Sequence, residues 1–207
     1  MSSVISSESA NQKPPVRQRV TPSSTNLLLV DEVTASEEVQ TLFAQYRERF
    51  GRTDLPGIVL CFATNAKVLK SMLELAENFL FGKSLLSRRH KEMIATYLSL
   101  QNACPYCADS HGALLATQGG RPEVICALRE GDLNPQLFTS AELALLEFAA
   151  KVNANSPPVT RVDVEAAMRA GWTEAQIAEA VHVAGLFAAF NRIANGFGLP
   201  SPYPDGL

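Results

Sequence analysis

Helical periodicity is the feature that most limits what this chain can fold into. Apolar residues recur at spacings of three and four in one segment after another, and no stretch sustains the strict alternation expected of a half-buried strand. Residues 36–50 show the pattern clearly, with Val39, Phe43 and Tyr46 along one face and Gly51 at the end. The sequence therefore predicts an all-α protein with about eight helices.

Capping residues and prolines mark where the predicted helices begin and end. Pro105 suits a first helical position, because its missing N–H has no partner there. Thr173 and Gln176 form a capping-box pattern ahead of a long apolar segment. We expect helices over residues 36–50, 65–80, 84 or 87 to 101, 105–118, 121–131, 141–153, 160–170 and 173–195, with a turn at 55–57.

Residues 1–25 differ in composition from the rest of the chain. They hold seven serines and three prolines, offer almost nothing to bury, and lack the continuous apolar segment of a secretory signal. We interpret them as a flexible N-terminal arm, followed by one helical domain over residues 26–207. Without a secretory signal the expected location is the cytoplasm, where a close cysteine pair is more often redox-active or metal-binding than structural.

The overall composition excludes several classes of protein. Lys and Arg total 18 against 21 Asp and Glu, and a formal net charge of -3 is not typical of a nucleic-acid binder. No apolar run reaches the roughly 18 residues needed to span a bilayer. Four cysteines in 207 residues do not make a disulfide scaffold. We therefore expect a globular protein that binds neither nucleic acid nor a membrane.

Residues 104–111 carry the strongest chemical signal. Cys104-Pro105-Tyr106-Cys107 is followed by His111, four positions after the second cysteine. If a helix starts at Pro105, Cys107 lies in its first turn, where free N–H groups and the helix dipole lower the pKa of a thiol. His111 then lies one turn beyond Cys107 on the same face, within reach of the thiol proton. A base beside a thiol is the arrangement of an activated nucleophile.

A glutamate on the preceding helix completes the candidate site. Glu92 lies about ten residues before the turn and His111 about eight after it, which places them roughly 15 and 12 Å along two antiparallel helices. The Glu92 face continues with the small residues Ala95, Thr96 and Ser99, so the next helix can approach closely. We therefore predict that Glu92 orients His111, either directly or through one water.

The same residues allow other interpretations. A lone Cys-x-x-Cys can be half of a structural zinc site, but Cys61, Cys126, His90 and His182 supply no second close pair of ligands. The CPYC motif also occurs in glutaredoxins, whose fold requires a βαβ context, whereas an amphipathic helix precedes the motif here. We expect Cys61 and Cys126 to be small core residues, His182 to be a core histidine and His90 to be solvated.

The stretch SLLSRRHKEMIATYLSLQNACPYCADSHGALL resembles the alkylhydroperoxidase D-like core, within the carboxymuconolactone decarboxylase superfamily. Glu92, Cys104, Cys107 and His111 stand at that family's intervals. Residues 66–69 and the C-terminal stretch GWTEAQIAEAVHVAGLFAAFNRIANGFGLP also resemble the longer, peroxidase-related members, so the likeness spans about residues 50–200. This chain departs from the best-studied members at Tyr106, where they carry a histidine between the cysteines.

The resemblance implies an all-helical fold, homo-oligomers such as trimers or hexamers, and a hydroperoxide substrate. In the implied mechanism, Cys107 is the peroxidatic thiolate, the His111–Glu92 relay deprotonates it, and Cys104 is the resolving thiol. An external dithiol then reduces the disulfide, and no cofactor is needed. The superfamily's decarboxylases lack the cysteine pair, so decarboxylase activity is not expected.

We therefore expect a thiol-dependent peroxidase, an oxidoreductase that acts on peroxide and has an antioxidant role. Two alternatives stay open: a disulfide reductase or thiol redox sensor that uses the same pair, and a metal-holding oligomeric binding module. Assembly is also expected from the residues themselves. The segment 177–197 is apolar on nearly every side, with only Glu179 and Arg192 charged, so part of its surface should be covered by another copy.

Overall fold

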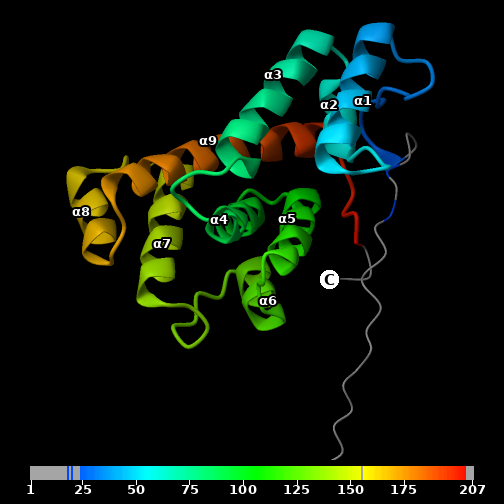
Figure 1. Ribbon diagram of the computed structural model, residues 1–207. Helices are drawn as coiled ribbons and strands as arrows, with labels where there is room; N and C mark the ends of the chain where they lie inside the picture. Colours follow the sequence, from blue (N-terminus) through cyan, green and yellow to red (C-terminus); the bar gives the residue numbers. More distant parts are fainter. Residues whose placement is uncertain (1–17, 19, 21–23, 155, 204–207) are drawn as a thin grey trace, which may run out of the picture.

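The computed structural model describes residues 18, 20, 24–154 and 156–203, so most of the predicted arm, residues 1–25, lies outside the described part of the chain. Every regular element in the described residues is a helix, and the all-α class is confirmed. The elements in Figure 1 are α1 (Glu37–Phe50), α2 (Gly57–Phe62), α3 (Ala66–Ala76), the π-helical η2 (Glu77–Phe81), α4 (Arg88–Gln101), α5 (Pro105–Thr117), α6 (Pro122–Glu130), α7 (Ser140–Ala154), α8 (Arg161–Arg169) and α9 (Glu174–Phe197).

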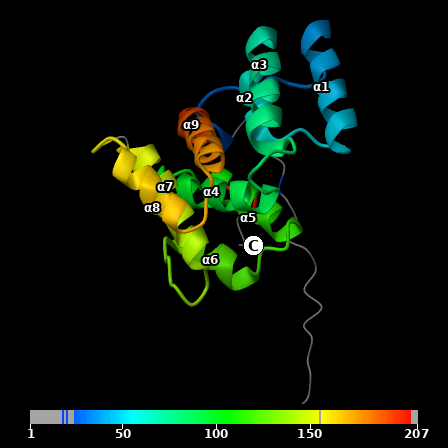
Figure 2. The ribbon, with the colours of Figure 1, turned by 60° about the vertical axis from the view of Figure 1, so that its left-hand side comes forward.

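Helix α4 lies at the centre of the fold. It packs against α5, α6, α7 and α9, and Figure 2 shows it among these helices. All residues from Lys91 to Ser99 are buried. The larger of two apolar clusters surrounds α4, and its members Ile94, Leu128 and Phe187 have no exposed surface. Glu92 is therefore buried because the helix that carries it is buried.

The first three helices form a separate layer above α9. In Figure 1, α1–α3 stand on the opposite side of α9 from α4–α7. The second apolar cluster joins this layer to α5 and α9, and it includes Phe43, Leu69, Cys104 and Cys107. Both cysteines therefore lie where the N-terminal layer meets the α4–α5 pair.

Most of the predicted helix boundaries are confirmed, because the capping residues form the expected bonds. The Val39 N–H donates to Ser36 Oγ at the start of α1, and Gly51 ends that helix in the left-handed conformation with φ of 59°. At the start of α9 the Gln176 N–H donates to Thr173 Oγ1, and the Thr173 N–H donates to Gln176 Oε1. The predicted capping box is thus present.

Two segments differ from the prediction. Helix α2 follows Pro56, where only a turn at 55–57 was expected; its sequence GIVLCF is almost wholly buried, so it has no polar face and no helical periodicity. The helix predicted over 65–80 instead divides in two. Helix α3 ends at Ala76, and η2 closes with a bond of 2.6 Å from the Gly82 N–H to the Glu77 carbonyl.

Helix α9 has the length and apolar composition of a membrane-crossing segment, but it is a core helix here. Half of the apolar stretch is buried inside the domain, where Ile177, Val183 and Phe187 pack into the larger cluster. Its outer face exposes Val181 and the small residue Ala178. The helix is therefore buried on one side, and its other side exposes small and apolar residues together with the polar His182 and Arg192.

Candidate active site

The turn between α4 and α5 places the two cysteines at the start of α5. Ala103 adopts a left-handed conformation with φ of 49°, which turns the chain out of α4. The Cys104 N–H donates to the Ser99 carbonyl at 2.9 Å. Cys104 is the N-cap of α5 and Pro105 its first residue, as the sequence predicted. Cys107 therefore lies in the first turn of α5.

Glu92 and His111 are in direct contact between α4 and α5. His111 Nδ1–H donates to Glu92 Oε2 at 2.6 Å, and the Glu92 side chain has no exposed surface. Ala95 and Thr96, the small residues that follow Glu92 on the same face, are also fully buried. Because Nδ1 is held by the carboxylate, Nε2 is the ring nitrogen left to exchange a proton.

Arg88 belongs to the same network, although the sequence analysis did not single it out. Its Nε–H donates to Glu92 Oε1 at 2.6 Å from one turn earlier on α4. The Arg88 guanidinium also lies over the Phe81 ring, 4.3 Å from the centroid. The four-residue spacing of Arg88 and Glu92 was the signal available in the sequence. Arg88 and His111 bind different oxygens of one carboxylate, so this buried acid is paired on both sides.

The two thiols form a hydrogen-bonded pair, and their pKa values move in opposite directions. The Cys107 S–H donates to Cys104 and lowers the pKa of Cys104 below its ordinary value. The same hydrogen bond, and then burial, raises the pKa of Cys107 well above its ordinary value. The lowered pKa expected for Cys107 at the helix N-terminus is therefore wrong for the paired thiols. Because the two thiols share this hydrogen bond, their protons are lost as a pair and not independently.

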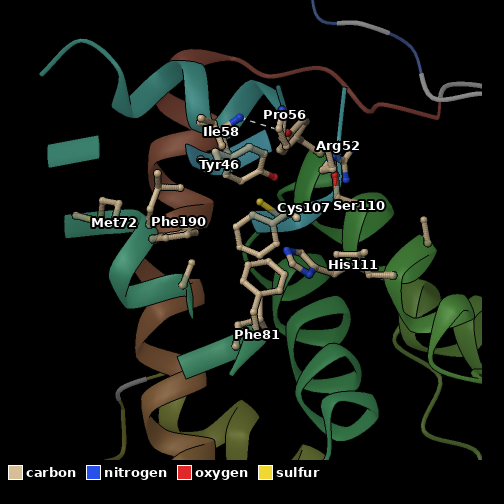
Figure 3. A pocket seen from close by; sticks show the side chains of 18 of the residues that line it. Tyr46, Arg52, Pro56, Ile58, Met72, Phe81, Cys107, Ser110, His111 and Phe190 are labelled. Atoms are coloured by element: carbon tan, nitrogen blue, oxygen red, sulfur yellow. Dashed lines mark hydrogen bonds between the residues drawn. The ribbon is translucent and has the colours of Figure 1, made fainter. Parts of the chain in front are cut away.

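Cys107 and His111 project from α5 into a cavity of about 460 Å³, shown in Figure 3. Cys107 keeps 4% of its surface exposed and Cys104 none, and only Cys107 is part of the cavity wall. A molecule that enters the cavity therefore meets Cys107 first. Ser110, on the same helix, also lines the cavity, and its hydroxyl is buried with no hydrogen-bond partner among the described residues.

Most of the cavity wall is apolar and comes from the N-terminal layer and α9. The aromatic and aliphatic side chains that form it include Tyr46, Phe50, Ile58, Phe62, Met72, Leu73, Phe81 and Phe190. Arg52 and Arg88 are the charged residues of the wall; Arg52 pairs with Asp54 at 2.9 Å, and Arg88 pairs with Glu92. The cavity thus suits a largely apolar molecule with its reactive end near Cys107.

Tyr106, between the two cysteines, fastens α5 to the N-terminal layer. Its ring is 3% exposed, and its hydroxyl accepts a hydrogen bond from the Ile58 N–H at 3.2 Å. It also lines the cavity beside Cys107. Tyr106 is therefore a buried residue that supports the cavity wall beside Cys107.

The remaining cysteines and histidines lie away from this chemistry. Cys61 is buried as expected, and burial raises its pKa to about 12, so it stays a neutral thiol. The core position predicted for Cys126 is wrong, because Cys126 is exposed. His182 is also exposed rather than in the core, and it stacks on Phe79. His90 is only partly solvated, because its ring packs edge-on against Trp172.

Among the described residues, the side chains around the cysteine pair do not form a metal-binding site. No group of three or more His, Cys, Asp or Glu side chains with metal-binding geometry occurs in the part of the chain that the structure describes. His111 is instead committed to Glu92 through Nδ1.

Comparisons with known proteins find one family match and several similar folds. Residues 66–151 match the model of the carboxymuconolactone decarboxylase family. No curated protein matches the chain in sequence. A solved alkylhydroperoxidase AhpD core, an uncharacterized peroxidase-related protein from Ralstonia eutropha JMP134, has 22% identity and a TM-score of 0.77 over 86% of this chain and 92% of that one. An uncharacterized peroxidase-related protein from Silicibacter sp. TM1040 has 25% identity and a TM-score of 0.72 over 93% and 94%.

The fold also occurs in a debrominase. The debrominase Bmp8, solved with 2,3,4-tribromopyrrole, has 17% identity and a TM-score of 0.65 over 81% of this chain and 86% of that one. Proteins with this fold therefore include both peroxidase-related members and a debrominase. Residues 66–151 therefore match the carboxymuconolactone decarboxylase family, and the chain as a whole has the helical fold of the alkylhydroperoxidase AhpD core.

Proposed function

We propose that this protein is a thiol-dependent peroxidase that reduces organic hydroperoxides. The observation that carries the proposal is the pairing of His111 with buried Glu92, one helical turn from Cys107, at the wall of an apolar cavity. A thiol, a base oriented by a carboxylate, and a largely apolar cavity for the substrate favour thiolate attack on a peroxide. Each step below uses side chains of this chain and an external dithiol, and we propose no cofactor.

The first step transfers one oxygen atom from the hydroperoxide to Cys107. His111 Nε2 takes the proton of the thiol, and the thiolate attacks the terminal peroxide oxygen. The S–O bond forms while the O–O bond breaks, so that sulfur is oxidised to sulfenic acid and the leaving alkoxide takes a proton from His111 to become an alcohol. Glu92 stabilises the imidazolium between these two proton transfers.

The second step closes a disulfide between Cys104 and Cys107. The Cys104 sulfur attacks the sulfenic sulfur of Cys107, and the hydroxyl leaves as water with the proton of the Cys104 thiol. An external dithiol then reduces the disulfide by thiol–disulfide exchange and is itself oxidised. The position of Cys104 at the N-cap of α5 and of Cys107 in its first turn supports this step, because it places the two cysteines within one helical turn.

Accessibility supports Cys107 as the attacking cysteine, although its pKa is raised while that of Cys104 is lowered. Cys104 has no exposed surface and does not line the cavity. Removal of the Cys107 proton by His111 Nε2 places the thiolate on the sulfur that faces the substrate. Because the pKa of Cys107 is raised, only a small fraction of this thiol is ionised near neutral pH. We therefore expect formation of the Cys107 thiolate to limit the rate of peroxide reduction at that pH.

Stopped-flow mixing of the reduced protein with cumene hydroperoxide and, separately, with hydrogen peroxide tests the function. We expect one alcohol and one Cys104–Cys107 disulfide per chain, with cumene hydroperoxide reacting faster because the cavity buries its apolar body. No oxidation above the uncatalysed rate would refute the peroxidase. If a disulfide substrate oxidised the pair while peroxides did not, the disulfide reductase or redox sensor would replace it.

We also propose that copies of the chain assemble through the outer face of α9. That face exposes Val181 beside the small residues Ala178 and Gly185, which allow another helix to approach closely. Closed symmetric assemblies are the usual result, and we expect a trimer or hexamer in the cytoplasm. Light scattering at micromolar concentration measures the mass directly, and a stable monomer of 22.4 kDa would contradict this prediction.

A further inference from the structure

The wall of the cavity beside Cys107 contains positive charge and, among the described residues, no acid. Arg52 and Arg88 belong to this wall, whereas no Asp or Glu side chain does. Each arginine has a carboxylate partner, but both partners, Asp54 and Glu92, lie outside the wall. A ligand in the cavity therefore meets guanidinium groups on a largely apolar surface.

Arg88 is already bound to the proton relay. It pairs with Glu92, which has no exposed surface, and its guanidinium lies 4.3 Å from the centroid of the Phe81 ring. Removing one partner of a buried ion pair leaves the other charge uncompensated, which strongly destabilises a fold. Arg88 therefore cannot exchange Glu92 for the charged group of a ligand.

Arg52 differs from Arg88, because its ion pair is open to water. The Arg52 side chain keeps 30% of its surface exposed and that of Asp54 keeps 50%. Arg52 Nε and Nη2 donate to Asp54 at 2.9 to 3.2 Å, and its third nitrogen, Nη1, has no hydrogen-bond partner among the described residues. Exposed ion pairs stabilise a protein little, so Asp54 can return to water at small cost. Arg52 can therefore bind a second carboxylate.

The acids near Arg52 line a different cavity. Arg52 and Tyr203 belong to the wall of the substrate cavity and also to that of a second cavity of about 460 Å³. The second wall holds Glu32 and Asp54, and Glu32 is paired with Arg47. Arg52 is thus the cation that separates an acidic cavity from an apolar one, and the nearby acids already have cationic partners.

Figure 3 shows where Arg52 stands relative to the reactive sulfur. Arg52 lies on one side of this view and Phe190 on the other, with the Cys107 sulfur between them. A molecule that places a carboxylate at Arg52 and its apolar part toward Phe190 therefore passes Cys107.

We propose that the cavity binds hydroperoxides of apolar carboxylic acids and that Arg52 binds their carboxylate. The proposal rests on the proposed peroxidase function, for which it names the substrate class. Arginine stays protonated in proteins, and its hydrogen bond to a carboxylate is roughly twice as strong as one between neutral groups. The reaction is unchanged: Cys107 takes the terminal peroxide oxygen, and the product is the corresponding hydroxy acid.

Two substrates that differ only in the carboxylate test this proposal: the hydroperoxides of linoleic acid and of methyl linoleate. Stopped flow gives the rate constant for oxidation of the reduced protein by each, in the wild type, in Arg52→Gln and in Arg52→Lys. We expect the acid to react about tenfold faster than the ester in the wild type. The ratio should fall to about one in Arg52→Gln, and Arg52→Lys should keep part of it because the charge remains.

The acid-to-ester ratio is taken within each variant, so a general effect of the substitution on the fold cancels. The ratio in the wild type should also fall as salt is added, because the Arg52 side chain is partly exposed and its charge is screened. This measurement needs no variant, and it keeps the proposal testable if Arg52→Gln does not fold.

Arg49→Gln is the matched control. Arg49 is an exposed arginine of α1 that pairs with Glu77 and does not line the cavity. Its loss removes the same charge from the protein, so the acid-to-ester ratio should match that of the wild type. An equal loss of the ratio in Arg49→Gln would assign the effect to net charge and would overturn the role of Arg52.

Two further results would overturn the proposal: equal rates for acid and ester in the wild type, or a ratio that survives in Arg52→Gln. Calorimetric binding of the corresponding alcohols, as acid and as methyl ester, separates the proposal from the function on which it rests. If no peroxide is reduced but the hydroxy acid binds more tightly than its ester and this requires Arg52, the carboxylate site stands and only the peroxidase is wrong. If both peroxides are reduced equally and both alcohols bind equally, only the substrate class is wrong.

Discussion

Replacing Cys107 by serine is expected to reduce peroxide consumption to the uncatalysed rate, whereas replacing Cys104 by serine leaves one turnover. A serine hydroxyl does not ionise near neutral pH, and Cys107 is the cysteine that the cavity exposes. Without Cys104 the sulfenic acid has no resolving partner, because Cys61 stays a buried thiol with a pKa of about 12. Dimedone labelling followed by mass spectrometry should then locate one sulfenic acid per chain, at Cys107.

Cys126→Ser is the control for these two variants. Cys126 is exposed on α6 and does not line the cavity, so its loss should leave the rate unchanged. The opposite role assignment has a distinct signature. If dimedone labelled Cys104 in Cys107→Ser as readily as it labels Cys107 in Cys104→Ser, the lower pKa of Cys104, and not accessibility, would decide which sulfur attacks.

Replacing Glu92 by glutamine is expected to shift the pH dependence of the reaction to higher pH. The amide oxygen can still accept from His111, but the NH2 group replaces the oxygen that accepted from Arg88, so the Arg88 contact is lost together with the negative charge. A neutral partner stabilises the imidazolium less, which disfavours the imidazolium–thiolate pair and raises the apparent pKa of Cys107 further. The thiolate fraction near neutral pH then falls, by about tenfold for each pH unit that the apparent pKa rises, and it recovers as the pH approaches that value.

Stopped-flow rates from pH 5 to pH 10 measure this shift, with Glu142→Gln as the matched control. Glu142 is also a buried acid paired with an arginine, Arg89, but it caps α7 at Thr139 and does not touch His111. Its variant should lose stability without any change in the shape of the rate profile. A Glu92→Gln profile that superimposes on the wild type would remove Glu92 from the mechanism.

The local features of this protein could be predicted from its sequence because they depend on neighbours along the chain. The spacing of apolar residues and the caps at Ser36, Ser87 and Thr173 define helices through bonds that span three or four residues. The contact between Glu92 and His111 could also be anticipated, because one short turn joins two helices and the rise per residue sets their heights. Helix α2 escaped prediction because a short, wholly buried helix has no polar face.

Other features depend on residues far apart in the chain, and only the tertiary structure decided them. The cavity forms because the N-terminal layer and α9 close over α5, so its size and apolar lining have no signature in any one segment. Asn191 lies 92 residues after Ser99 in the sequence, and packing of α9 against α4 brings its amide to the Ser99 hydroxyl. The raised pKa of Cys107 has a local cause, the hydrogen bond to Cys104 three residues earlier, and a long-range cause, the burial of this thiol under the N-terminal layer. Sequence alone therefore determined which residues can react, whereas long-range packing determined how deeply they are buried and what can reach them.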